Sequence, residues 1–298
     1  MSSHTQKLRT GPAIFAIVAA VLALSLGDAL VKWTGTTVPL WQMYIMRSAF
    51  ALPVLFVLAR REGVIRLHAP GWVVLRSALL VVMWVCYYLS LPLMPLSLAA
   101  AAFYTSPLFI LALSAVATRR WPAPVAQLAI VTGFLGVVLI IRPDTSGFQL
   151  GTVLPVLAAC LYACAMVLTA SKCRDDSPLV LAFALNVAFI LGGAGLGLLS
   201  SPEPSFALGP WQPINAQLLM TMAALGALIL IGSVGAAFAY QNGPPATIAV
   251  FDYSYLIFSL LWGSLFFSEA PDIIALIGIA AIIGSGVLTL SPRARAAV

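Results

Sequence analysis

The sequence predicts an all-α polytopic membrane protein with ten transmembrane helices, arranged as two inverted five-helix repeats with both termini in the cytoplasm. Three observations predict this fold class. The chain has 298 residues, of which 62% are hydrophobic and only 8% charged, whereas a soluble domain carries about 25% charged residues. Apolar segments of about 20 residues, the length that a membrane-spanning helix needs, recur along the whole chain. The two halves of the chain also share one pattern of prolines.

The proline pattern indicates an internal duplication. Three prolines of the first half each have a counterpart 149 residues later (for example 292 − 143): Pro95, Pro122 and Pro143 correspond to Pro244, Pro271 and Pro292. Tyr104 and Tyr253 fall in the same register. Because prolines are rare and lie between apolar segments, their shared order and spacing are more specific than matches between apolar residues. We therefore expect two repeats, at residues 1–143 and 144–298.

Ten apolar segments account for the predicted spans. They lie at about 11–33, 39–59, 70–91, 96–118, 124–141, 151–171, 178–199, 214–240, 245–267 and 272–290. The first is too long for a signal-peptide core and lacks a clear cleavage site, so it counts as a span. With the N-terminus in the cytoplasm, the inner segments hold eleven of the 15 basic residues, in agreement with the positive-inside rule. Because each repeat has an odd number of spans, the repeats are expected to cross the membrane in opposite directions.

Short connections and single residues predict local features of the spans. The turns at 92–95 and 242–245 are expected to fold spans three and four, and spans eight and nine, into antiparallel hairpins at the centre. Pro107 is expected to kink span four, whereas Leu256 leaves span nine without such a defect. Five tryptophans at span ends are expected at the level of the lipid headgroups: Trp33, Trp41, Trp72, Trp121 and Trp211.

Five charged residues fall within the predicted spans. A charge near the bilayer centre costs about 2.5–3.5 kcal/mol on insertion scales, so such residues usually face protein or a water-filled cavity. Asp28 and Lys32 lie four residues apart in span one and can pair with each other. Arg47 in span two lies too deep to reach the interface and is expected to have an acidic, carbonyl or substrate partner. Arg76 is expected to extend its stem to the cytoplasmic interface, and Asp252 to act as a hydrogen-bonding, gating or proton-carrying group.

Aromatic residues form a second set of candidates. All the tyrosines of the chain lie within predicted spans, although this residue type normally favours the interface. Each one alone is explained by core packing, but as a group they predict an aromatic cavity with polar edges. The residues expected to line it are Trp84, Tyr87, Tyr88, Phe103, Tyr104, Tyr162, Tyr240, Tyr253 and Tyr255.

Several short motifs resemble the drug/metabolite transporter superfamily, in its EamA-like ten-helix branch. In the first half they are the Leu-Gly-Asp-Ala-Leu-Val-Lys stretch at 26–32, the segment 104–107, and Gly133-x-x-Gly136 leading to Ile141-Arg142-Pro143. In the second half they are the segments 253–256, 268–271 and 284–286. The family often carries a Glu at the end of span four, as Glu269 does for span nine, whereas this chain has Arg119 and Arg120 there.

The resemblance implies a secondary transporter that exports small amphipathic metabolites across the cytoplasmic membrane of a bacterium by alternating access. The aromatic-rich composition is similar to that of the family's amino-acid exporters, which implies aromatic or large neutral amino acids as substrates. Arg47 or Lys32 would hold a substrate carboxylate, and Asp28 or Asp252 its ammonium group. Asp28, Lys32 and Asp252 are the candidates for coupling or gating. The expected partners are a small-molecule substrate and the lipid bilayer.

Other function classes fit the sequence less well. A multidrug exporter of the same fold would tolerate loss of Arg47, because a hydrophobic cation has no carboxylate. An integral membrane enzyme needs polar residues that meet at one depth, yet the only histidines are His4 and His68, both in loops. A channel would need a ring of equivalent polar residues, and none is visible. We expect no cofactor, no metal, no nucleic-acid partner and four free thiols, since the cysteines lack metal-site spacing.

Overall fold

The computed structural model describes residues 3–34, 37–61, 63, 67–106, 108–110, 112–113, 124–141, 150–173, 176–242 and 251–289. The α-helices of these ranges are α1 (Ser3–Thr34), α2 (Leu40–Arg61), α3 (Pro70–Ser90), α4 (Leu96–Phe103), α6 (Pro124–Ile141), α7 (Leu154–Lys172), α8 (Pro178–Gly197), α9 (Ala216–Asn242), α11 (Ser254–Phe267) and α12 (Ile273–Thr289). A short 3-10 helix, η1 (Leu150–Val153), precedes α7. Features predicted at Pro107, Arg119, Arg120, Trp121, Pro122, Arg142, Pro143, Pro244 and Pro292 lie outside the described residues.

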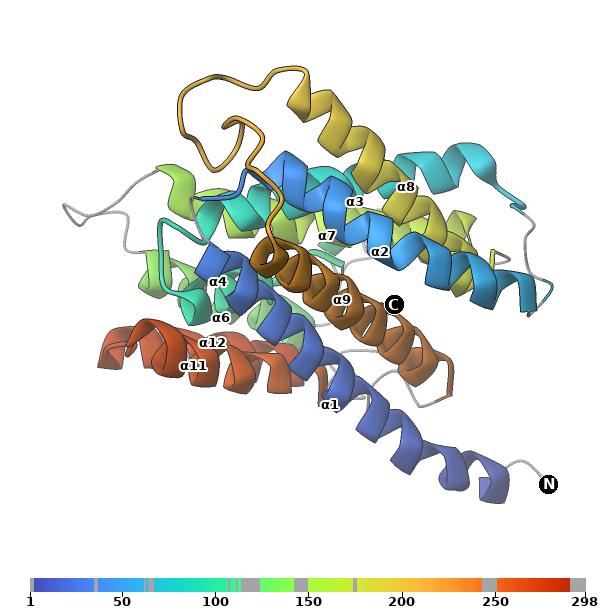
Figure 1. Ribbon diagram of the computed structural model, residues 1–298. Helices are drawn as coiled ribbons and strands as arrows, with labels where there is room; N and C mark the ends of the chain where they lie inside the picture. Colours follow the sequence, from blue (N-terminus) through green and yellow to red (C-terminus); the bar gives the residue numbers. More distant parts are fainter. Residues whose placement is uncertain are drawn as a thin grey trace.

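The helices have the length and composition of membrane spans. Each predicted apolar segment contains one of the described helices, and the helical bundle of Figure 1 has no β-strand in the described ranges. Six helical stretches are long and apolar enough to cross a membrane, and shorter apolar helices occur at Gln127–Ile140, Ser254–Phe267 and Ile273–Leu288. Large apolar side chains are exposed along the outside of the bundle, for example Val131 and Leu135 of α6 and Ile277 of α12. Such surfaces suit a lipid environment, and the chain is a multi-pass membrane protein.

The two halves of the chain interlock. α1 packs against α9 and α11, α2 against α8 and α9, α3 against α7 and α8, and α4 against α11 and α7. The remaining major pair, α6 and α12, lies side by side in Figure 1. Each of these pairs joins a helix that precedes residue 143 to one that follows it. The core of the bundle is therefore an interface between the halves.

The packing of α3 and α4 goes beyond the hairpin predicted for spans three and four, and residues 243–245 of the second predicted turn lie outside the described part of the chain. The turn at 92–95 does connect α3 to α4, but the main packing partners of both helices lie in the second half. Ala99, Ala100, Ala101 and Ala102 are all fully buried, which allows the neighbouring helices to approach α4 closely. This small-residue surface directs α4 towards α11 and α7 instead of α3.

Glycines bring α6 and α12 into close contact. A Cβ atom added to Gly136 would lie 2.7 Å from the carbonyl oxygen of Gly278, and one added to Gly278 would lie 2.8 Å from the carbonyl oxygen of Gly136. Real Cβ atoms do not approach carbonyl oxygens so closely. Both positions therefore require glycine for the observed backbone separation.

Spans four and nine are both interrupted. α4 ends at Phe103 and a turn follows at Tyr104 and Thr105, while α11 begins at Ser254 directly after a turn at Tyr253. The two interruptions are 149 residues apart (253 − 104). Leu256, the counterpart of Pro107, keeps its backbone hydrogen bond as expected, yet span nine is interrupted as well. The amide of Leu256 donates a hydrogen bond to the carbonyl oxygen of Tyr253 at 3.0 Å, so a missing proline-type donor does not explain the second interruption.

The connection between α8 and α9 docks on the start of α2. The Leu40 amide donates to the Phe206 carbonyl oxygen at 2.7 Å, and the Gln42 side chain exchanges two hydrogen bonds with the backbone of Gln212. Trp41 is buried, donates its Nε1–H to the Gly209 carbonyl oxygen at 2.9 Å and packs on Trp211. This connection covers the Trp41 ring, which therefore faces protein at the start of α2, and its expected depth at the lipid headgroups stays a prediction. These contacts hold the first turns of α2, which carry the candidate site.

Candidate binding site

Aromatic side chains from six helices form one continuous set of ring contacts inside the bundle. We call it the aromatic network, and it consists of Tyr44, Trp84, Tyr87, Tyr88, Phe103, Tyr104, Tyr162, Phe189, Tyr253 and Tyr255. Ring centroids of successive members lie 4.9–6.2 Å apart, for example 5.0 Å between Trp84 and Tyr88 and 5.1 Å between Tyr104 and Tyr255. Tyr104 and Tyr253, which share a register in the two halves, are in direct ring contact at 5.6 Å.

The structure brings together eight of the nine aromatic residues expected from the sequence. Phe103 connects the members from α3 to Tyr162 of α7, and Tyr104 connects them to α11. Tyr240 lies in α9, and its side chain is outside the described part of the structure. Two members were missed. The sequence marks Tyr44 only as one of the tyrosines within spans, and Phe189 of α8 has no polar atom that distinguishes it from a core residue.

Arg47 of α2 lies at one end of this network. Its side chain is buried, with 2% of the residue exposed, and its guanidinium carbon lies 4.4 Å from the ring centroid of Phe189 and 4.7 Å from that of Tyr44. The rings of Tyr88 and Trp84 follow at 5.5 Å and 6.0 Å. Cation–π attraction of this kind is stronger away from water. The Arg47 Nη1–H donates to the hydroxyl oxygen of Tyr88 at 3.0 Å.

The rest of the Arg47 guanidinium is unsatisfied. Its Nε and Nη2 atoms are buried and have no hydrogen-bond partner, and within the described ranges no carboxylate lies at ion-pair distance from Arg47. Buried polar groups in proteins are nearly always hydrogen-bonded, and a buried cation nearly always has a counter-charge. The predicted acidic or carbonyl partner of Arg47 is thus not found among these residues, which leaves a ligand as the partner to consider.

Asp28 of α1 is a buried carboxylate within electrostatic range of Arg47. It is 3% exposed, and it accepts a hydrogen bond on Oδ2 from the hydroxyl of Tyr255. The Tyr255 hydroxyl lies 3.2 Å from that of Tyr87, and the Tyr87 and Tyr88 hydroxyls and the Arg47 charge all lie within electrostatic range of Asp28. Asp28 and Arg47 therefore border one polar region, separated by tyrosine hydroxyls.

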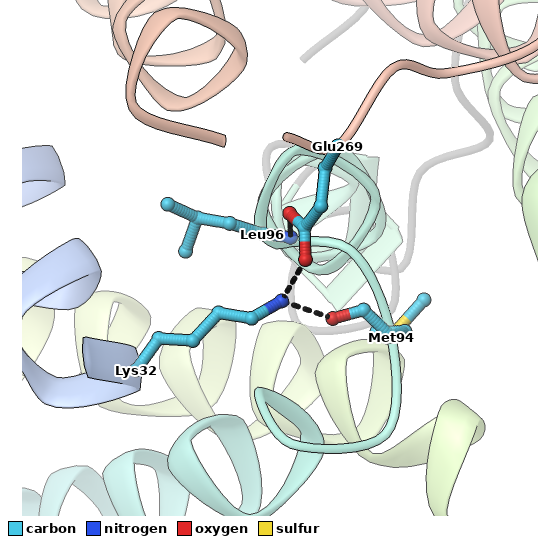
Figure 2. A network of polar contacts seen from close by, with 4 residues as sticks. All are labelled: Lys32, Met94, Leu96 and Glu269. Carbon is cyan, nitrogen blue, oxygen red and sulfur yellow. Dashed lines mark hydrogen bonds and ion pairs between the residues drawn. The ribbon is translucent and has the colours of Figure 1, made fainter. Parts of the chain in front are cut away.

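Lys32 does not pair with Asp28, contrary to one of the pairings that the sequence allowed. Figure 2 shows its ammonium group between the Glu269 carboxylate and the carbonyl oxygen of Met94, which it contacts at 2.8 Å. The second carboxylate oxygen of Glu269 accepts the backbone N–H of Leu96, the first residue of α4, at 2.9 Å. We call these four residues the Lys32–Glu269 clasp. It ties together the end of α1, the turn before α4 and the segment after α11, at the end of the bundle predicted to face outward.

Two other charged candidates also face protein. The Asp252 carboxylate accepts a hydrogen bond from the hydroxyl of Tyr104 at 3.4 Å, which places it beside the aromatic network. Arg76 donates its Nε–H to the hydroxyl of Thr169 on α7 at 2.7 Å and is only partly exposed. Thr169 lies three residues before the end of α7 at Lys172, and the expected extension of Arg76 to the cytoplasmic interface stays a prediction.

Metal chemistry has no ligand set in the described ranges. No group of three or more His, Cys, Asp or Glu side chains is placed there to hold a metal ion. Cys86, Cys160, Cys164 and Cys173 are free. His68 is largely exposed and donates its backbone N–H to Asp176 at 2.6 Å, near the opposite end of the bundle from the clasp. None of these residues contributes to the aromatic network.

Known proteins similar to this chain are membrane transporters. Residues 11–142 match the model of the EamA-like transporter family. A riboflavin transporter of Vibrio cholerae is 30% identical over 241 residues, covering 79% of this chain and 76% of that protein. The pseudopaline exporter CntI of Pseudomonas aeruginosa is 27% identical over 269 residues, covering 88% and 91%. A crystal structure with 19% sequence identity superposes with a TM-score of 0.65, covers 96% of this chain and 99% of that one, and shows the same fold. The chain therefore belongs to the drug/metabolite transporter superfamily and has the features of its EamA-like family.

Proposed function

We propose that this protein is a secondary transporter that exports small amphipathic metabolites, aromatic or large neutral amino acids among them. The membrane would be the cytoplasmic membrane of a bacterium, and the mechanism alternating access between the two halves of the chain. Membership of the transporter superfamily supports the general activity. The substrate class, the direction of transport and the mechanism are the parts that we propose.

The observation that carries the proposal is the aromatic network together with the two charged residues that contact it, Arg47 and Asp28. Ring faces can stack on a planar substrate. Tyrosine hydroxyls can donate hydrogen bonds to its polar groups or accept hydrogen bonds from them. Arg47 supplies a positive charge and Asp28 a negative one within the same region. A zwitterion with an apolar side chain needs these three elements together, so the site suits such a molecule.

The packing of the helices supports a mechanism based on two inverted repeats. Taking the helices of each half in their order along the chain exchanges α1 with α7, α2 with α8, α3 with α9 and α6 with α12. Under this exchange the pair α1–α9 becomes α7–α3, and the pair α2–α9 becomes α8–α3, and both resulting pairs are present. Substrate sites of inverted-repeat transporters lie between the repeats near the membrane centre. The members of the aromatic network come from both halves of the chain, which supports a substrate site between the repeats.

The names of the similar proteins point to varied substrates. They refer to riboflavin and to pseudopaline, and neither name refers to an amino acid. A site made largely of ring faces is compatible with this variety, because stacking tolerates different rings better than hydrogen bonding does. The amino-acid substrate stays a prediction that needs a direct test.

Counterflow in proteoliposomes tests the proposal. Vesicles containing the full chain are loaded with unlabelled aromatic or large neutral amino acids, with riboflavin, or with a hydrophobic cation, and entry of labelled tryptophan is followed without a pH gradient. Saturable entry that depends on amino acids in the lumen is the expected result. Entry driven only by the hydrophobic cation would favour a multidrug exporter instead, and no exchange with any compound by folded protein would contradict the proposed substrate class.

A further inference from the structure

One turn of α2 concentrates buried polar atoms that lack partners. In the described ranges, eight buried side-chain nitrogen or oxygen atoms have no hydrogen-bond partner, and four of them belong to residues 44–48. These four are the Tyr44 hydroxyl, the Nε and Nη2 atoms of Arg47 and the Ser48 hydroxyl. Tyr44 and Ser48 are fully buried, as Arg47 nearly is. Because each unpaired buried group costs about 1–3 kcal/mol, such a cluster needs an explanation.

The three residues share one face of α2. Their spacing of three and four residues places the side chains next to each other on the helix surface. The Tyr44 ring lies 4.7 Å from the Arg47 guanidinium carbon, and its hydroxyl is within electrostatic range of the Arg47 charge. The unpaired atoms are therefore concentrated beside one cation and not scattered through the core.

Ser48 differs from Ser25, Ser90 and Ser259, three other buried serines of the bundle, and shares its unpaired hydroxyl with Ser77 of α3. Ser25, Ser90 and Ser259 donate their hydroxyls to carbonyl oxygens of their own helices at 2.6–3.0 Å. This local bond is the usual way in which a serine inside a helix is satisfied. Ser48 does not make it, although it is fully buried. Its hydroxyl is therefore available to another acceptor.

The chemistry of the free atoms selects an anion. The Nε–H and Nη2–H bonds of a guanidinium point the same way along one edge and match the two oxygens of a carboxylate. The third nitrogen of Arg47 is already bonded to Tyr88, so this edge is the part that remains. Hydroxyl donors from Tyr44 and Ser48 would add to it. With a single positive charge, and Asp28 within electrostatic range, the site favours a monoanion over a doubly charged phosphate.

We propose that Tyr44, Arg47 and Ser48 form a subsite that binds the carboxylate of the transported molecule. This inference rests on the proposed function, and it narrows the substrates to ring-containing monocarboxylates, zwitterions included. Lys32, the other cation considered for this role, is already held by Glu269 and Met94. Ser48 is thus a substrate-binding residue that a search for charged and aromatic cavity residues does not find.

The test compares a ligand that ends in a carboxylate with one that has the same ring and ends in an ammonium group. Purified full-length protein is titrated with indole-3-propionate and with tryptamine, which has the same ring but no carboxylate, and thermal unfolding reports binding. Ser48→Ala should weaken binding of indole-3-propionate about tenfold, as expected for one hydrogen bond to a charged group, and should leave tryptamine unaffected. Ser259→Ala, a buried serine whose hydroxyl bonds to its own helix, is the matched control and should change neither.

Other variants cover the case in which one variant does not fold. Arg47→Gln should abolish the response to indole-3-propionate. If that variant is unfolded, Tyr44→Phe serves in its place and should weaken binding as Ser48→Ala does. The subsite is refuted if wild-type protein does not respond to indole-3-propionate, or if Ser48→Ala and Ser259→Ala have equal effects. Counterflow tests the proposed function separately from the subsite. Counterflow of riboflavin or tryptamine by a protein that does not bind indole-3-propionate would support a transporter and reject the carboxylate subsite. Binding of indole-3-propionate that depends on Ser48, without counterflow of any compound, would support the subsite and reject the proposed transport activity.

Discussion

Disruption of the Lys32–Glu269 clasp should destabilise the protein, and the pattern of losses among single and double variants should show which contacts the clasp makes. Lys32→Ala removes two charge-assisted hydrogen bonds, to Glu269 and to the Met94 carbonyl oxygen, and leaves a carboxylate unpaired. Hydrogen bonds to charged groups contribute about 1.5–3 kcal/mol each when buried. The Lys32 and Glu269 side chains are 12% and 18% exposed, so screening by solvent reduces the contribution of these hydrogen bonds to stability. We expect Lys32→Ala to lower the free energy of unfolding by about 2–3 kcal/mol.

Glu269→Ala should have a cost of similar size, since it also leaves the Leu96 N–H at the start of α4 unpaired. The double variant should lose less than the sum of the two single variants, by about 1–2 kcal/mol, because the Lys32–Glu269 contact can be lost only once. Exchange of the charges, Lys32→Glu with Glu269→Lys, should not restore stability. A lysine at position 269 would face the positive N-terminal end of α4, where only an anion is favourable.

The measurement is unfolding of the purified protein in mixed detergent micelles, followed by tryptophan fluorescence. Lys172→Ala is the control, since the Lys172 ammonium group lies over the ring of Trp72 and away from the clasp. Its effect should stay within about 0.5 kcal/mol. Strictly additive single variants would show that the two residues do not interact in the membrane protein. A charge exchange with wild-type stability would show that Glu269 does not cap α4.

Two further predictions concern packing and coupling. Gly136→Ala should destabilise the contact between α6 and α12 by about 1–3 kcal/mol, because the new Cβ would overlap the carbonyl of Gly278, whereas Gly284→Ala, with nothing within 4 Å, should be neutral in the same unfolding assay. Asp28→Asn should make counterflow insensitive to an imposed pH gradient, because an amide cannot carry a proton, whereas Tyr255→Phe should keep that sensitivity while losing one hydrogen bond to Asp28. A response of Asp28→Asn equal to that of the wild type would exclude Asp28 as a proton carrier.

The positions of the spans could be predicted from the sequence because each one depends on local composition. A run of about 20 apolar residues has one favourable place, the hydrocarbon of a bilayer, whatever its neighbours are. The partners of each helix could not be predicted in this way. α3 and α4 are adjacent in sequence, yet α3 packs mainly on α7 and α4 mainly on α11. A helix in lipid gains little free energy by packing on a neighbouring helix unless small residues let the two backbones approach closely.

The aromatic part of the site was predictable because residue type and depth are both visible in a sequence. A tyrosine in the middle of a span has a polar atom to satisfy, and several such residues at one depth can satisfy one another. The carboxylate subsite was not predictable beyond Arg47. Ser48 is a residue that most helices accommodate with a local hydrogen bond, so nothing in the sequence marks it as unpaired. Only the structure shows that its hydroxyl lacks this bond.

The partners of α1 show why pairing within one helix was the weaker expectation. Asp28 and Lys32 have the spacing of an intrahelical ion pair, but such a pair contributes only about 0.2–0.5 kcal/mol. Both side chains instead contact α11 or the segment after it: Tyr255 donates to Asp28, and Glu269 pairs with Lys32. A third residue of α1, Ser25, accepts a hydrogen bond from Trp262 of α11 at 3.0 Å. These contacts satisfy buried polar groups that would otherwise be unpaired. The free energy lost by leaving one such group unpaired exceeds the free energy gained from an intrahelical ion pair. Since Asp28 borders the candidate site and Lys32 belongs to the clasp, a displacement of α11 from α1 would open the clasp and release Asp28 in the same motion.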